Sequence, residues 1–76
     1  MNKQRRKNLE DIRNQLADLR ELLDEIREEE EFYRDNIPEN LQYSERYEAA
    51  DNAVSNLENA VISLDEALSS IEEAQG

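Results

Sequence analysis

Residues 9–33 read LEDIRNQLADLRELLDEIREEEEFY, and apolar side chains recur in this run at alternating spacings of three and four. This spacing is the heptad repeat of a coiled-coil helix, in which positions a and d form one apolar stripe. Counted from Leu9 as position a, the stripe comprises Leu9, Ile12, Leu16, Leu19, Leu23, Ile26 and Tyr33, with Glu30 at the remaining a position. The run therefore predicts a long amphipathic helix.

A second apolar series with the same spacing runs from Tyr43 to Ile71. The segment between the two series, residues 35–40, is the only one rich in turn-forming residues. Within it, Pro38 disfavours helical backbone at Ile37. The sequence therefore predicts a second helix, separated from the first by one short loop.

Capping residues suggest where the two helices end and begin. We expect Asn36 to end the first helix in a left-handed C-cap conformation and Ser44 to act as the N-cap of the second. Basic residues oppose the positive end of a helix dipole, so the first turn is expected to fray. The prediction is one domain over residues 1–76, with a basic start at 1–7, helices over 3–35 and 44–74, and a loop over 36–43.

The two series match one another when the chain folds back as an antiparallel hairpin. Pairing residues whose numbers add to 80 sets each a position beside a d position, from Leu9 and Ile71 to Tyr33 and Tyr47. At position e, arginines then face acids, and the expected ion pairs are Arg6–Glu72, Arg13–Asp65, Arg20–Glu58 and Arg27–Asp51. Each exposed pair contributes only about 0–1 kcal/mol, but four in register disfavour a slipped alignment. The predicted fold is all-α, an antiparallel two-helix coiled-coil hairpin.

Small residues along the second helix predict a further packing surface. Alanine recurs there every seven residues at position g, and Leu22 and Ile62 are apolar residues outside the hairpin stripe. A lone hairpin buries little apolar surface against an ordering cost of about 1.5 kcal/mol per residue. We therefore expect a homodimeric four-helix bundle, although helix propensity alone would also explain the alanines. The candidate oligomer-interface residues are Leu22, Ala53, Ala60, Ile62, Ala67 and Ala74.

Composition excludes most catalytic chemistry. The 76 residues include 20 acids and 9 bases, for a net charge of −11, with no histidine, no cysteine and one glycine. Serine–histidine relays, zinc fingers, disulfides and glycine-rich phosphate loops are therefore excluded. We expect no enzyme activity, no cofactor and no bound metal. Without a long apolar run or a signal-peptide pattern, a cytoplasmic location with no membrane association is expected.

Two features near the loop are candidates for partner binding. One is the acidic run that begins at Glu28, and the other is the set of aromatic residues flanking the loop, because exposed aromatics are common among binding hot spots. The candidate residues are Glu28, Glu29, Glu30, Glu31, Phe32, Asp35 and Tyr43. The alternatives are a solvated acidic face and a local aromatic cluster that closes the turn.

The basic start is a weak candidate for nucleic-acid binding. Residues 3–7 carry a charge of +4, which leaves −15 on the rest of the chain. An acidic remainder repels phosphate, so we expect no nucleic-acid partner. The acidic surface would instead suit a protein partner with a basic surface, although solubility alone would also explain the charge.

The part of the sequence that is most specific for a protein family is the loop with the start of the second helix. It consists of two segments, Pro38-Glu39-Asn40-Leu41-Gln42 and Ser44-Glu45-Arg46-Tyr47-Glu48. With these segments and the acidic heptads that follow, nearly the whole chain resembles a group of short acidic helical-hairpin proteins of bacteriophages, prophages and mobile elements. The resemblance implies an accessory protein and supplies no catalytic residues.

The expected function is a small interaction module that binds and modulates or inhibits a host protein. A basic nucleic-acid-handling or defence factor, bound through electrostatic complementarity, is its most specific form. The alternative is a purely structural oligomerisation or assembly module with no inhibitory target.

Overall fold

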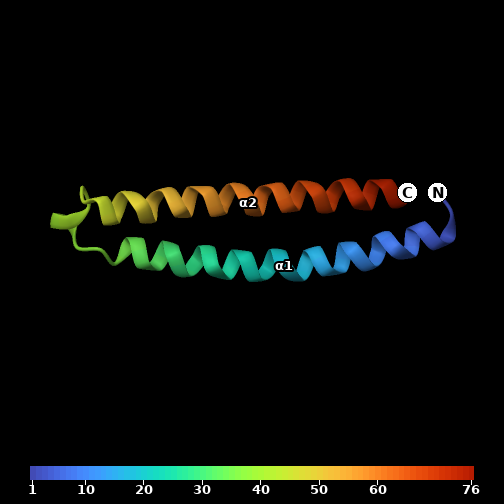
Figure 1. Ribbon diagram of the computed structural model, residues 1–76, viewed down its shortest axis with the longest axis horizontal. Helices are drawn as coiled ribbons and strands as arrows, with labels where there is room; N and C mark the ends of the chain where they lie inside the picture. Colours follow the sequence, from blue (N-terminus) through green and yellow to red (C-terminus); the bar gives the residue numbers. More distant parts are fainter.

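Helix α1 spans Lys3–Asp35 and helix α2 spans Glu45–Gln75, and the two lie side by side in opposite directions (Figure 1). A short 3₁₀ helix, η1, spans Glu39–Leu41 between them. The computed structural model describes all of residues 1–76, and its principal extents are 59 × 15 × 13 Å. The all-α antiparallel two-helix hairpin predicted from the heptads is confirmed.

Side-chain caps explain where the two helices begin. The Asn2 side-chain oxygen accepts a hydrogen bond from the Arg5 backbone N–H at 2.8 Å, so α1 starts at Lys3 despite its basic first turn. The Ser44 hydroxyl accepts a hydrogen bond from the Tyr47 N–H at 3.3 Å, as expected for the N-cap of α2. Both caps satisfy backbone N–H groups that have no partner within the helix.

The end of α1 differs from the expected left-handed cap. Asn36 is the C-cap residue, but its φ of −92° and ψ of 0° lie outside the left-handed region, so that prediction is wrong. The Asn36 side-chain amide donates to the Phe32 carbonyl at 2.7 Å, and its backbone N–H donates to the same carbonyl at 3.1 Å. Because the side chain itself satisfies the helix end, no left-handed turn is needed.

The ion pairs between the two helices lie one heptad away from the expected pairs. Ion pairs join Arg13 to Glu72 at 2.8 Å, Arg20 to Asp65 at 2.9 Å and Arg34 to Asp51 at 2.9 Å. The residue numbers of each pair add to 85, whereas those of the expected pairs add to 78. The four expected pairs, Arg6–Glu72, Arg13–Asp65, Arg20–Glu58 and Arg27–Asp51, are therefore wrong. Each arginine still faces an acid at position e, so the heptad pattern alone does not distinguish the two sets of pairs. The helices themselves are not displaced by seven residues, because Gln75 Nε2 donates to the Arg6 carbonyl at 3.2 Å and these residue numbers add to 81.

The core of the hairpin is small and lies mostly on α2. Only Ile37, Ala50, Val54 and Val61 are buried, and α1 contributes no buried residue. Sequence reasoning placed Ile37 in the loop and missed its burial, at 4% exposure, beside the end of α1. Four buried residues are a small core for a chain of 76 residues, and small domains are marginally stable for this reason.

Helix α1 faces α2 with a different stripe from the one expected. Its a positions are half-buried, and the Arg27 side chain at position e is only 19% exposed. At position d, Leu19 and Ile26 are 57% and 53% exposed, and Ile12 and Tyr33 are exposed as well. The prediction that the d positions of α1 lie between the helices is therefore wrong. Arginine stems are long and aliphatic, so they cover apolar surface while their guanidinium groups reach acids of α2, as in Arg13, Arg20 and Arg34, or acids of α1, as in Arg27.

Candidate protein-interaction surfaces

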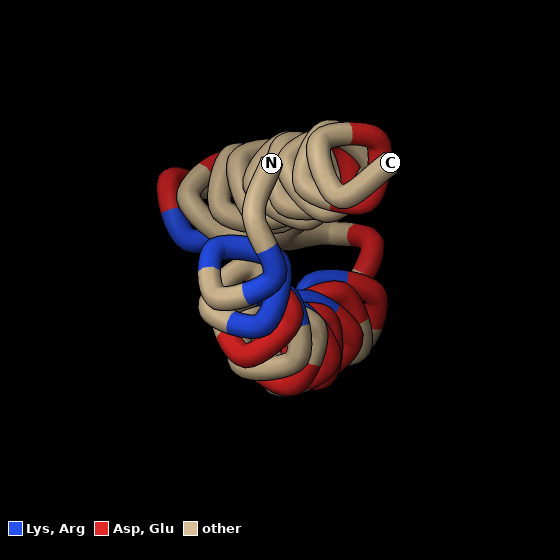
Figure 2. Tube along the Cα trace, turned by 90° about the vertical axis from the view of Figure 1, so that its right-hand side faces the viewer, with Lys and Arg blue, Asp and Glu red and all other residues tan.

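Charge is distributed unevenly between the two helices. Helix α1 carries eight of the nine basic residues and eleven of the twenty acids. Figure 2 accordingly shows α2 mostly in tan, with acids at its edges, and most of the red and blue on α1. The outer surface of α2 is therefore the less charged side of the hairpin.

Three arginines organise the ion pairs of α1. Arg27 contacts Asp24 at 2.7 Å as well as Glu28 and Glu31, all within its own helix. The hydrogen bond from Arg27 lowers the pKa of Asp24, and the same bond raises the pKa of Arg27. Hydrogen bonds to Asp65 and Asp35 raise the pKa of Arg20 and Arg34 respectively.

The acidic run near the loop is not a uniform patch. Glu28 and Glu31 contact Arg27, and Asp35 contacts Arg34 at 3.0 Å, so three of the candidate carboxylates are paired. Glu29 is exposed and Glu30 is half-buried, and neither makes an ion pair. No cluster of three or more acidic side chains is arranged to hold a metal ion. The structure therefore leaves Glu29, together with the largely exposed Glu28, as the acids of the run that are most open to a partner.

The aromatic residues do not form one packed cluster. Tyr33 is exposed, its hydroxyl accepts a hydrogen bond from the Arg46 Nε at 2.5 Å, and the Arg46 guanidinium lies 5.2 Å from the ring centroid. The expected core layer of Tyr33 against Tyr47 is therefore absent. Phe32 and Tyr43 are 73% and 97% exposed, so the loop end of the hairpin presents two uncovered aromatic rings.

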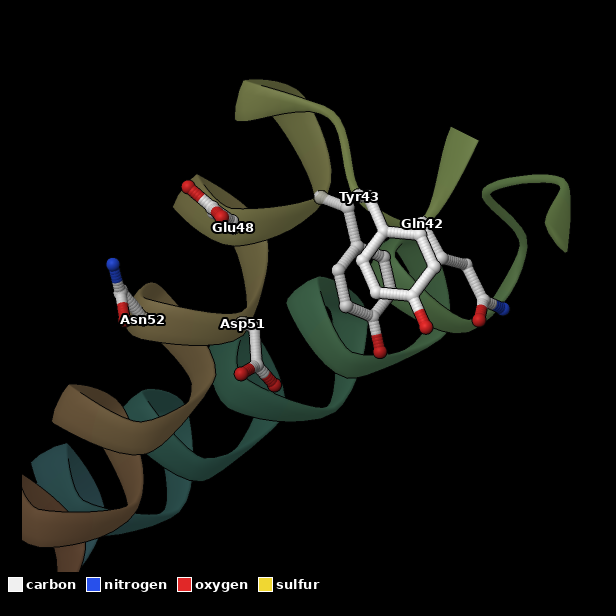
Figure 3. A pocket seen from close by; sticks show the side chains of 6 residues that line it. Gln42, Tyr43, Glu48, Asp51 and Asn52 are labelled. Atoms are coloured by element: carbon white, nitrogen blue, oxygen red, sulfur yellow. The ribbon is translucent and has the colours of Figure 1, made fainter. Parts of the chain in front are cut away.

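A hollow beside the loop has Tyr43, Tyr47 and two acids among its six lining residues (Figure 3). Glu48 and Asn52 point away from the Tyr43 ring in Figure 3, and Asp51 is paired with Arg34 at 2.9 Å. The two carboxylates therefore do not converge on a common point, and the hollow lacks the arrangement of a cation pocket.

One face of α1 remains apolar and uncovered. We call Ile12, Leu19, Leu22 and Ile26 the open stripe, and each of them is about half exposed. Because successive residues turn by about 100° around a helix, Leu19, Leu22 and Ile26 lie on one side of Leu23 and the arginines lie on its other side. The sequence identified Leu22 but assigned the other three residues to the hairpin core.

The alanines of α2 lie on the same side of the hairpin as the open stripe. We call the four alanines at position g the alanine strip: Ala53, Ala60, Ala67 and Ala74. Around the helix, the strip lies on one side of the buried Val61 and the ion-paired acids lie on its other side. Since ion pairs at position e join the helices along one edge, positions d and g of both helices fall on the other. Ile62 is two residues from Ala60, roughly 160° around the helix, so it does not share this face.

Comparisons with known proteins found no relative. No protein-family model matches the chain, and no curated protein or solved structure is similar to it. In the structure, neither α1 nor α2 is long and apolar enough to cross a membrane.

Proposed function

We propose that the chain is a small acidic protein-interaction module of the phage or mobile-element type. In this proposal it acts in the host cytoplasm, where it binds a host protein that has a basic surface and modulates or inhibits it. The observation that supports the proposal is the excess of free acid: eight of the twenty acids form ion pairs, which leaves twelve unpaired. Unpaired surface charge accelerates and selects association with a surface of opposite charge.

A basic nucleic-acid-handling or defence factor is the most specific form of this partner. Acids spaced along a rod 59 Å long present negative charge at intervals, as a duplex presents its phosphates. The exposed rings of Phe32 and Tyr43 would add apolar contacts at the loop end, beside Glu28 and Glu29. We therefore place the partner-binding surface at this end of the hairpin.

Dimerisation into a four-helix bundle is the second part of the proposal. The exposed Leu22 and the alanine strip share one face of the hairpin, and four buried residues give a single chain little core. A purely structural assembly module is the alternative function, and the same exposed face supports it.

An affinity capture from host lysate tests the partner. The bait is the whole chain, and its variant replaces Glu28 and Glu29 by Gln. The matched control replaces Glu66 and Glu73 by Gln, because these two acids of α2 are exposed and make no ion pair and the change in net charge is the same. We expect the wild-type chain and the control to capture a basic protein at low salt, with capture lost at high salt.

The Glu28/Glu29 variant should capture much less of that protein. Equal capture by all three baits would refute the placement at the loop end. No salt-sensitive capture by any bait would refute the basic partner and favour the assembly module.

A further inference from the structure

We infer that the uncovered face of the hairpin is self-complementary, so that the open stripe of one copy lies along the alanine strip of a second copy. This inference rests on the dimer proposed above and specifies how it is built. The two helices present side chains of different size on this face: α1 presents Leu and Ile, and α2 presents Ala. Small residues allow close approach of another helix, and large residues fill the space between them.

The size of this face suits a dimer. A second copy packed along the whole broad side of the hairpin, 59 by 15 Å, would cover a projected area of roughly 900 Å², against about 800 Å² per partner in a standard interface. The large exposed residues on it, Ile12, Leu19, Leu22 and Ile26, follow one another along more than four turns of α1. Exposed apolar patches of this extent in a small chain mark interaction surfaces.

Charge selects which helix of the second copy covers α1. A row of acids at position c runs along the outer border of the open stripe and comprises Asp11, Asp18 and Glu25. All three are exposed and none makes an ion pair. If two α1 helices packed on each other, these two acidic rows would meet. The corresponding row on α2 is uncharged, with Asn56, Ser63 and Ser70 all exposed. Packing α1 on α2 of the second copy therefore avoids repulsion between like charges.

A two-fold axis along the length of the hairpin produces this pairing. Such an axis turns the second hairpin to face the first and keeps every residue at its own height. Within one chain Arg20 reaches Asp65 and Gln75 reaches the Arg6 carbonyl, so Leu19 lies at a height between Ala60 and Ala67. The axis then brings Leu19 of one copy against the alanine strip of the other between Ala60 and Ala67. By the heptad repeat it brings Ile12 between Ala67 and Ala74 and Ile26 between Ala53 and Ala60.

The resulting bundle has consistent helix directions. Each α1 has an α2 on two sides, one from its own chain and one from the second copy, and all adjacent helices are antiparallel. Both loops lie at the same end, so Phe32 and Tyr43 of the two copies are presented together. Ile62 stays outside the interface, on the far side of α2.

Cross-linking tests the pairing directly, because the chain has no cysteine of its own. One sample mixes chains carrying Leu19→Cys with tagged chains carrying Ala67→Cys, and the matched control replaces the second variant by Ala53→Cys. Ala53 stands on the same strip, but 14 residues or roughly 21 Å away along the helix. With a short bis-maleimide, we expect the Leu19–Ala67 mixture to yield at least several-fold more tagged heterodimer than the control.

Two results would overturn the inference. One is a Leu19–Ala53 yield equal to or above that of Leu19–Ala67, and the other is faster linkage of Leu19→Cys to itself than to Ala67→Cys. In either case the chain would still be a dimer, so the dimer proposed above would survive. A monomeric wild-type chain would refute both the inference and the dimer proposed above.

A pair of bulky substitutions supplies an independent test. Ala67 is exposed in the hairpin, so Ala67→Trp fits a single chain but collides with the second copy. Ile62→Trp adds a similar bulk on the opposite side of α2. We expect Ala67→Trp to halve the mass measured by light scattering, with helical circular dichroism retained, and Ile62→Trp to remain dimeric. A dimeric Ala67→Trp would contradict the inference.

Discussion

Arg27 illustrates how single residues determine the packing of α1. Its stem is mostly covered, its guanidinium binds Asp24 at 2.7 Å, and it also contacts Glu28 and Glu31. A neighbouring residue that is fully apolar, Ile26, is more than half exposed. The amphipathic character of arginine therefore decides which side of α1 faces α2.

The Asp24–Arg27 pair makes a prediction about pH. The pKa of Asp24 is lowered from its ordinary value of 3.8. The pair therefore stabilises the folded chain fully when the pH is above 3.8, and this stabilisation is lost as the pH falls through the lowered pKa. We expect Asp24→Asn to melt at a lower temperature than wild type by a constant difference between pH 7 and pH 5. The difference should shrink below about pH 4. Thermal melts followed by circular dichroism would check this, and a difference that did not vary with pH would contradict it.

The N-cap of α2 makes a second prediction at this scale. Loss of a Ser cap typically destabilises a protein by about 1 kcal/mol, so Ser44→Ala should lower the melting temperature by several degrees. Ser55 is an exposed serine in the interior of α2, where alanine is the better helix former, so Ser55→Ala serves as the control. Equal melting temperatures for Ser44→Ala and the wild type would show that the cap contributes nothing.

At the scale of the helices, the sequence predicted the elements well and the ion pairs between them poorly. Heptads, Pro38 and the Ser44 cap identified two helices and one turn, because these signals act within a few residues. The ion-pair register was wrong because a repeat of seven residues fits itself equally well after a shift of seven. The predicted contact face of α1 was wrong because hydrophobic periodicity counts arginine as polar and takes no account of its aliphatic stem, which can be buried.

The observed register makes its own prediction. Arg20 binds Asp65 in the structure, whereas the pairing expected from the sequence would bring it to Glu58. Double-mutant cycles on thermal stability should therefore show favourable coupling between Arg20 and Asp65 and none between Arg20 and Glu58. Coupling to Glu58 in place of Asp65 would contradict the ion pairs described and support those expected from the sequence.

At the scale of the whole molecule, each part of the surface has a distinct composition. One edge carries the ion pairs between helices, the outer side of α1 carries free acid, and the remaining face carries the open stripe and the alanine strip. Sequence reasoning predicted an interface at the alanines and Leu22. It assigned Ile12, Leu19 and Ile26, which are exposed in the structure, to the hairpin core, because core and surface apolar residues follow the same heptad pattern.

The oligomeric state of the wild-type chain tests the account most directly, because the open stripe is left in water unless a second copy covers it. The measurement is the mass in solution at micromolar concentration, by light scattering after size exclusion. The account predicts a dimer, with a mass twice the 8.9 kDa of the single chain. A mass of 8.9 kDa under the same conditions would contradict the account.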